Sequence, residues 1–188
     1  AVNVRFGYLP KPYGGVKTAH LSGEVSIDQY LRTMIAMTLY RDVLADPSEA
    51  AWIHKFLAAC ADCWAWNNYS FPYFTTMCRW GIGASHSVAF GLFCSAVGMK
   101  LGGKHHASWF RVFLDRTAPL EKAPAYHQST NAASLTIMAM KALCVYQPKL
   151  KSQWVRYAKT IYMNASAGVD TNGREWLFTF QSGQKRGE

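Results

Sequence analysis

The sequence predicts an all-α fold: a compact core of about six helices, flanked by extended N- and C-terminal arms. Three observations favour this class. Apolar residues recur at helical spacing in several segments, helix-capping residues open some of those segments, and glycine or proline ends others. The chain has 188 residues, of which 50% are hydrophobic and 14% aromatic, so one domain can bury a substantial core.

The first 23 residues form the predicted N-terminal arm. They contain two prolines, four glycines and no acidic residue, so neither a helical nor an alternating apolar period runs through them. Aromatic side chains at Phe6, Tyr8 and Tyr13 need a surface that covers them. We expect these three residues to contact a neighbouring subunit.

Two helices are predicted next, at residues 27–45 and from Pro47 onward. Residues 26–29 match a capping box, and Asp46 with Pro47 and Glu49 forms a second start signal. The expected buried positions of the first helix are Ile27, Tyr30, Leu31, Met34, Ile35, Thr38 and Leu39. Those of the second helix are Trp52, Ile53, Phe56, Leu57, Cys60 and Trp64.

Four more helices follow a break in the pattern. Residues 67–76 contain adjacent asparagines and a proline, which predicts a loop or a short extended piece. A third helix begins at Ser85 or Ser87 and is ended by Gly102 and Gly103. The last three helices are predicted at residues 105–114, 131–146 and 149–164. The helical core domain therefore spans residues 24–167.

Residues 168–188 form the predicted C-terminal arm. A turn signal at residues 172–173 precedes a short aromatic stretch, and a polar end follows it. The apolar residues of this arm are Trp176, Leu177, Phe178 and Phe180. They can fold back on their own core or dock on a neighbour. We expect docking on a neighbour, which builds an open helical filament.

Charge is distributed unevenly along the chain. Twenty Lys and Arg against eleven Asp and Glu give a formal net charge of +9. Residues 24–62 hold six acids and three bases, whereas residues 100–159 hold ten bases and two acids. Such a chain can pair head to tail with copies of itself and keep positive charge for a polyanion. We expect that polyanion to be single-stranded RNA.

Basic residues alternate with aromatic ones in the middle of the chain. Lys and Arg neutralise phosphates regardless of sequence, and aromatic faces stack with any base. We predict non-specific nucleic-acid binding, although each aromatic residue taken singly also suits the core, and Phe110 is expected to point there. The predicted nucleic-acid-binding residues are Arg79, Lys104, Trp109, Arg111, Arg116 and Lys122.

The five cysteines are interpreted as buried thiols of a reducing compartment. Cys60 and Cys63 have the spacing of a zinc knuckle, with Cys78 and His86 as further ligands, but a second closely spaced pair is lacking. The sequence also lacks the nucleophile-elbow, HExxH, phosphate-loop and dinucleotide motifs. We therefore expect no metal, no cofactor and no enzyme activity.

One enzyme alternative stays open. Residues 67–70 and 126–127 resemble the Asn-Asn-His-Ser and Tyr-His-Asn stretches of the helical alginate lyases. That likeness implies action on an acidic polysaccharide, with Asn68, Tyr126 and His127 in charge neutralisation and proton transfer. Tyr69 stands where the lyase motif has His, and the chain is short for a helical toroid.

The order of arm, helical core and arm resembles the coat proteins of flexuous filamentous plant viruses, of the potexvirus kind. Three stretches carry the likeness: residues 63–76, 108–113, and 162–167 with the aromatic tail. The likeness implies a structural protein of the virion and host cytoplasm, with RNA in an inner groove and arms on adjacent subunits. It implies that Arg111 contacts the RNA. In that family an Asp supports the RNA-binding Arg. Its segment would fall at residues 136–143 of this chain, which contain no acidic residue.

A membrane-spanning segment is not expected. The longest nearly uncharged apolar run covers residues 87–99, well short of the roughly 20 residues that cross a bilayer. The start of the sequence lacks the basic and apolar regions of a signal peptide, so we expect no uncleaved leader.

Overall fold

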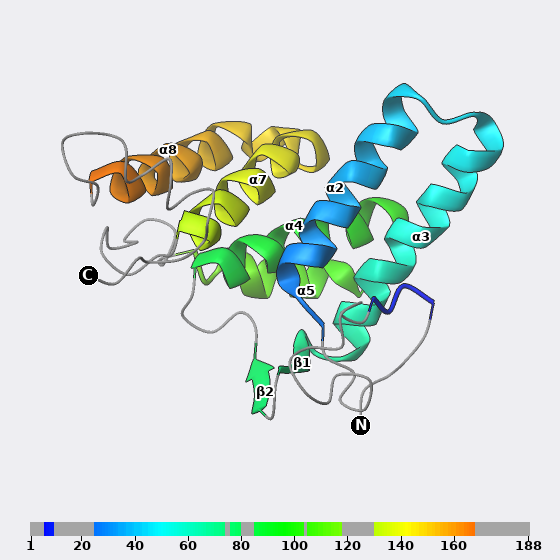
Figure 1. Ribbon diagram of the computed structural model, residues 1–188, viewed down its shortest axis with the longest axis horizontal. Coiled ribbons are helices and arrows are strands. Elements are labelled where there is room, and N and C mark those ends of the chain that lie inside the picture. Colours follow the sequence, from blue (N-terminus) through cyan, green and yellow to red (C-terminus); the bar gives the residue numbers. More distant parts are fainter. Residues whose placement is uncertain are drawn as a thin grey trace.

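A computed structural model describes residues 6–9, 25–73, 76–79, 85–103, 105–117 and 130–167. These residues form six α-helices, a short 3-10 helix and one two-stranded antiparallel hairpin (Figure 1). The all-α expectation is therefore confirmed. The helices are α2 (Ile27–Val43), α3 (Pro47–Trp66), α4 (Ser85–Leu101), α5 (His106–Leu114), α7 (Thr130–Tyr146) and α8 (Lys151–Ala167). The shorter elements are β1 (Ser70–Tyr73), β2 (Thr76–Arg79) and η1 (Pro148–Leu150).

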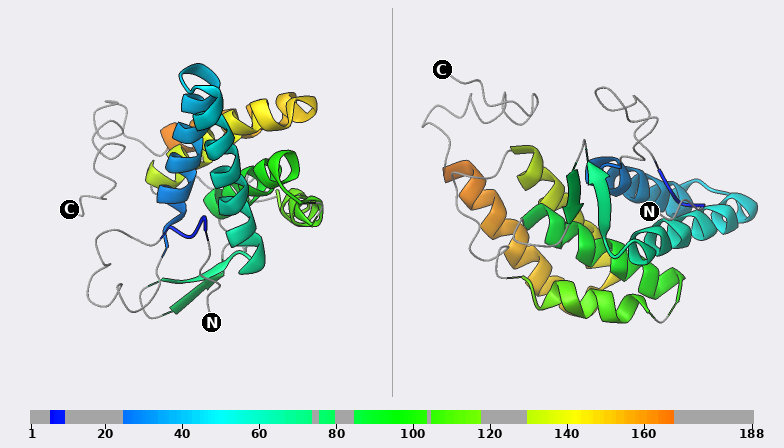
Figure 2. Two further views of the ribbon diagram at one scale, coloured as in Figure 1. Left: turned by 90° about the vertical axis from the view of Figure 1, so that its right-hand side faces the viewer. Right: turned by 90° about the horizontal axis from the view of Figure 1, so that it is seen from below.

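Helix α4 is the centre of the fold. Every residue from 88 to 98 is buried, so this helix is apolar on all sides and belongs in the interior. It contacts α3, α5 and α7. Figures 1 and 2 place the α2–α3 pair at one end of the molecule and α8 at the other, with α4 between them.

The start of α3 matches its predicted capping box. Asp46 Oδ1 accepts hydrogen bonds from the backbone N–H groups of Ser48 (2.7 Å) and Glu49 (2.9 Å). The Glu49 carboxylate accepts in return from the backbone N–H of Asp46 at 3.1 Å. The capping box predicted at residues 26–29 is wrong, because the Ser26 side chain makes no cap hydrogen bond.

Two residues predicted to be buried lie at the surface instead. Leu39 is 60% exposed and Trp52 is 50% exposed. Both belong to the half of the α2–α3 pair that extends beyond the other helices (Figure 1). Helical spacing identifies the apolar face of a helix but not how far along that face the rest of the core reaches.

Helix α5 packs unusually close to α4. A Cβ atom on Gly91 would lie 2.3 Å from the Phe113 ring, and one on Gly98 would lie 2.4 Å from the His106 ring. Real Cβ atoms do not approach that closely, so the two glycines are what admits these rings. Phe113 and His106 are both buried as a result.

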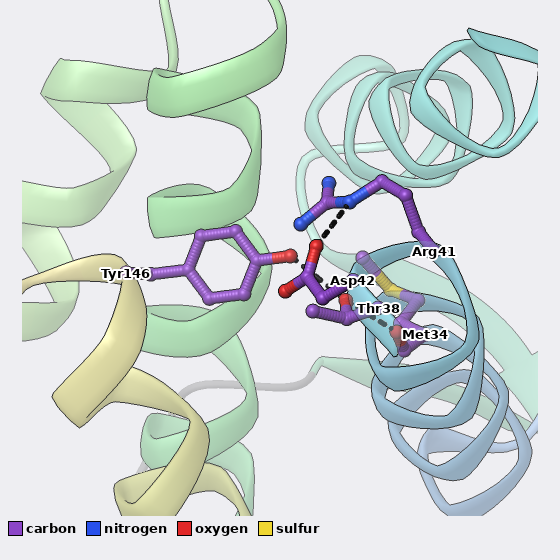
Figure 3. A network of polar contacts seen from close by, with 5 residues as sticks. All are labelled: Met34, Thr38, Arg41, Asp42 and Tyr146. Atoms are coloured by element: carbon purple, nitrogen blue, oxygen red, sulfur yellow. Dashed lines mark hydrogen bonds and ion pairs between the residues drawn. The ribbon is translucent and has the colours of Figure 1, made fainter. Parts of the chain in front are cut away.

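One polar contact joins the α2–α3 pair to α7 (Figure 3). Thr38 Oγ1 donates to the Met34 carbonyl at 2.8 Å and lies 2.8 Å from the Tyr146 hydroxyl. Since the Thr38 proton is used on Met34, Tyr146 is the donor to Thr38. Beside them on α2, Arg41 Nε pairs with Asp42 Oδ1 at 2.8 Å.

Residues 6–9 of the predicted N-terminal arm lie on their own core. The Tyr30 hydroxyl donates to the Gly7 carbonyl (2.8 Å) and accepts from the backbone N–H of Leu9 (2.7 Å). Tyr8 is half-buried, whereas Phe6 is 58% exposed and meets the Phe56 ring edge-on. Tyr13 and the apolar residues of the C-terminal arm lie outside the described residues, so their subunit contacts stay predictions.

Candidate functional site

Three of the predicted nucleic-acid-binding residues lie on α5 or directly after it. Arg111 and Arg116 are exposed. Trp109 is half-buried, with its ring centroid 5.0 Å from that of Tyr69 and 6.2 Å from that of Phe113. Arg79 lies in β2, but its side chain falls outside the description. Lys104 and Lys122 also lie outside the described residues.

The α5 residues do not form one patch. Trp109 and Arg111 are two positions apart, which separates them by roughly 200° around the helix. Trp109 faces the rings of Tyr69 and Phe113, and Arg111 therefore faces away from them. Phe110 is 7% exposed, as predicted. Base stacking on Trp109 beside a phosphate contact from Arg111 is therefore disfavoured, and Arg111 stands as a separate cationic position.

The described helices divide into an acidic pair and a basic remainder. Residues 27–66 hold five acids and three bases, whereas the described residues from 85 to 167 hold eight bases and only Asp115 as an acid. All eight bases are exposed. They are Lys100, Arg111, Arg116, Lys141, Lys149, Lys151, Arg156 and Lys159.

A groove of about 620 Å³ runs between α7 and α8. Its lining is almost entirely apolar, and it includes the exposed side chains of Val155 (41%), Tyr162 (49%) and Met163 (62%). Lys141 and Lys159 contribute the only charges in the lining. We call this surface the basic groove.

The end of the α2–α3 pair at which the two helices are joined exposes both apolar and acidic side chains. Leu39, Val43, Leu44 and Trp52 are 60%, 73%, 72% and 50% exposed. Three acids, Asp42, Asp46 and Glu49, lie in the same short stretch of chain as one base, Arg41, which pairs with Asp42. We call the four apolar residues and the three acids the acidic tip. The basic groove and the acidic tip thus combine exposed apolar side chains with opposite charge.

A third cluster joins Asp62 of α3 to the start of α5. Asp62 Oδ1 lies 2.7 Å from His106 Nε2 and 3.4 Å from His105 Nε2. His106 is fully buried, and burial lowers its pKa, although the Asp62 hydrogen bond opposes that shift. The neutral imidazole therefore donates from Nε2 to Asp62. The adjacent histidines at positions 105 and 106 were the available sequence signal for this cluster, but Asp62 lies 44 positions before His106 in the chain.

The cysteine pair belongs to the core. Cys60 and Cys63 are fully buried, and burial is the main cause that raises the pKa of each thiol. The Tyr30 hydroxyl lies within hydrogen-bond range of Cys63 Sγ, at 3.9 Å. The predicted buried thiols are confirmed at Cys60, Cys63 and Cys94, whereas Cys144 is only half-buried, so the prediction is wrong there.

The residues of the alternative lyase interpretation are only partly described. Asn68 is exposed, but Tyr69 beside it is 1% exposed and surrounded by the rings of Trp64, Trp109 and Phe113. A buried phenol cannot reach a polysaccharide. Tyr126 and His127 lie outside the described residues.

Comparison with protein-family models, curated proteins and solved structures finds no match. Among the described helices, none has both the length and the apolar character that crossing a bilayer requires.

Proposed function

We propose that the protein is a structural coat protein that polymerises into a helical filament and packages single-stranded RNA without sequence specificity. Its place is then the virion and, before assembly, the host cytoplasm. One observation carries the proposal: the acidic excess is confined to α2 and α3, and eight exposed bases face one acid in the described residues that follow. This partition gives one end for self-association and a positive surface for a polyanion.

The exposed bases suit phosphate contacts. Within the described part of the chain, no carboxylate lies within ion-pair distance of Lys100 or Arg111. Their charges are therefore not cancelled by an acid and can neutralise phosphates of any sequence. The proposed RNA contacts keep Arg111 as their central residue and Arg116 as its neighbour. The other predicted residues of this set, Arg79, Lys104, Trp109 and Lys122, remain proposals.

Polymerisation is proposed to join the acidic tip of one copy to the basic groove of the next. The groove exposes apolar side chains between Lys141 and Lys159, and the tip exposes apolar side chains beside three acids. Apolar burial supplies the attraction, and the opposite charges select the partner and orientation. An RNA strand would leave the apolar lining of the groove without a matching surface, so a second copy is the favoured occupant.

The turn between α2 and α3 and the helix α8 lie towards opposite ends of the molecule (Figures 1 and 2), whereas the end of α7 meets α2 through Tyr146 and Thr38. A contact between unlike surfaces of identical chains leaves one tip and one groove unused at the ends of every oligomer. Such a heterologous contact grows into a filament unless its rotation closes a ring. An open helical filament is therefore the proposed assembly.

Negative-stain electron microscopy of the purified protein, together with its ratio of absorbance at 260 and 280 nm, tests the proposal. Long flexible rods with a nucleic-acid spectrum are the expected result. A monomer that retains no RNA at low salt would overturn it. Release of unsaturated uronate ends from alginate, detected by ultraviolet absorbance, would instead establish the lyase.

A further inference from the structure

Three potential metal ligands converge where α3 meets the start of α5. They belong to Asp62, His105 and His106, which each offer a ligand atom within 4.8 Å of the other two. Asp62 Oδ1 lies 3.4 Å from His105 Nε2 and 2.7 Å from His106 Nε2. Two imidazoles with one carboxylate suit a borderline transition metal such as Zn²⁺. Mg²⁺ and Ca²⁺ prefer all-oxygen sites. We propose that Asp62, His105 and His106 bind one Zn²⁺ ion, independently of the proposed coating function.

One separation between the ligand atoms already suits this ion. Zn²⁺ bonds to nitrogen and oxygen at about 2.1 Å, so tetrahedral ligand atoms lie about 3.4 Å apart. Asp62 Oδ1 and His105 Nε2 are separated by 3.4 Å. Asp62 Oδ1 and His106 Nε2, at 2.7 Å, share a hydrogen bond that must open by about 0.7 Å to admit the ion.

The site is rigid on one side and accessible on the other. His106 is fully buried, and its ring lies so close to Gly98 that no larger residue fits there. Asp62 and His105 have side chains that are 22% and 45% exposed. An ion can therefore enter from solvent and keep a water molecule as its fourth ligand.

The buried Nδ1 atom of His106 sets the expected affinity. In the metal-free arrangement Nε2 carries the proton, and Nδ1 has no hydrogen-bond partner. When Nε2 binds zinc, the proton moves to Nδ1, which then lacks the acceptor that metal-binding histidines usually have. The loss of such a partner typically weakens binding 10- to 100-fold. We expect a Kd in the micromolar range rather than the nanomolar range.

The test is calorimetric titration of the tag-free chain with ZnCl₂, with thermal unfolding as a second readout. The informative variant is H105A, because His105 is exposed and its removal leaves the Asp62–His106 hydrogen bond in place. The matched control is H54A, another exposed histidine that lies outside the cluster. A C78S/C144S variant removes the two thiols that are not shown to be fully buried.

The expected result is one zinc ion per chain and a Tm that rises by several degrees with excess zinc. H105A should lose at least tenfold in affinity, while H54A and C78S/C144S keep the wild-type value. The proposal is overturned if wild type binds no zinc at 1 mM, if H105A binds as wild type does, or if C78S/C144S abolishes binding.

Discussion

The α2–α3 and α7–α8 pairs are built alike and differ in what they expose. Each consists of two helices joined by a short connection, and each leaves large apolar side chains in solvent. The α2–α3 pair places acids beside those side chains, and the α7–α8 pair places lysines beside them. Charge thus distinguishes two exposed apolar surfaces that are otherwise similar. In the proposed assembly this difference lets each surface bind the other and not its own kind.

The largest expected effect is a loss of filament assembly when the exposed apolar residues of the acidic tip are replaced by charged ones. V43D/L44D puts two charges into the acidic tip, where the native residues are 73% and 72% exposed. The fold should tolerate them, but docking in an apolar groove would desolvate both charges. We expect the protein concentration needed for filaments to rise at least 100-fold, as measured by sedimentation.

The matched control for that variant is V145D. Val145 is 58% exposed, lies in the last turn of α7 as Val43 does in α2, and is not part of the groove lining. It should assemble as wild type does. Equal loss of filaments in V43D/L44D and V145D would show that any added charge prevents assembly.

Two tryptophans give the next comparison. Trp154 of α8 is fully buried, and its indole N–H donates to the Gln147 carbonyl at 3.2 Å, whereas Trp52 of α3 is half exposed. W154A should cost about 3–5 kcal/mol in the free energy of unfolding, and W52A less than about 1 kcal/mol. Urea unfolding measures both. Equal costs would mean that Trp52 belongs to the core after all.

The salt dependence of RNA binding should distinguish the basic helices that follow α3 from the acidic α2–α3 pair. Each phosphate neutralised on single-stranded RNA contributes a slope of about −0.7 in log K against log [salt]. R111A should therefore flatten the slope by about 0.7 and leave the chain folded. The control K55A removes an exposed base from α3 and should leave the slope unchanged. An unchanged slope for R111A would remove Arg111 from the RNA surface.

The smallest expected effect is a loss of stability when the hydrogen bond between α2 and α7 is removed. Y146F removes the hydroxyl that donates to Thr38, and it should cost about 1 kcal/mol in the free energy of unfolding. T38V breaks the same bond from the other side. In urea unfolding the double variant should cost less than the sum of the two single variants. Strictly additive costs would show that the two groups do not interact.

Local signals predicted most of the helices but few of the surfaces. The start of α3 and the end of α4 follow from Asp46, Pro47 and the glycines after Leu101. The β1–β2 hairpin was predicted only as a loop or short extended piece. Its entry depends on Asn68 and Tyr69, which have φ values of 51° and 52°, and few residues other than glycine adopt that conformation.

The sites depend on contacts between distant residues, which no local pattern reports. The Asp62–His106 contact exists because Gly98 lets α5 approach α4, and the basic groove exists because α8 folds back on α7. Alternation of bases and aromatics favoured Trp109 as an RNA contact. Its ring is instead committed in part to Tyr69 and Phe113, because a helix turns it to the opposite side from Arg111.

The central claim is that the acidic tip of one copy binds the basic groove of another. Mixing two charge-reversed variants tests it most directly. K141E/K159E makes the groove acidic, and D42K/E49K makes the tip basic, with circular dichroism to verify that α3 keeps its helix after loss of the Glu49 cap. We predict that neither variant sediments as filaments alone and that an equimolar mixture does. A mixture that stays monomeric beside filamentous wild type, or single variants that assemble normally, would contradict the claim.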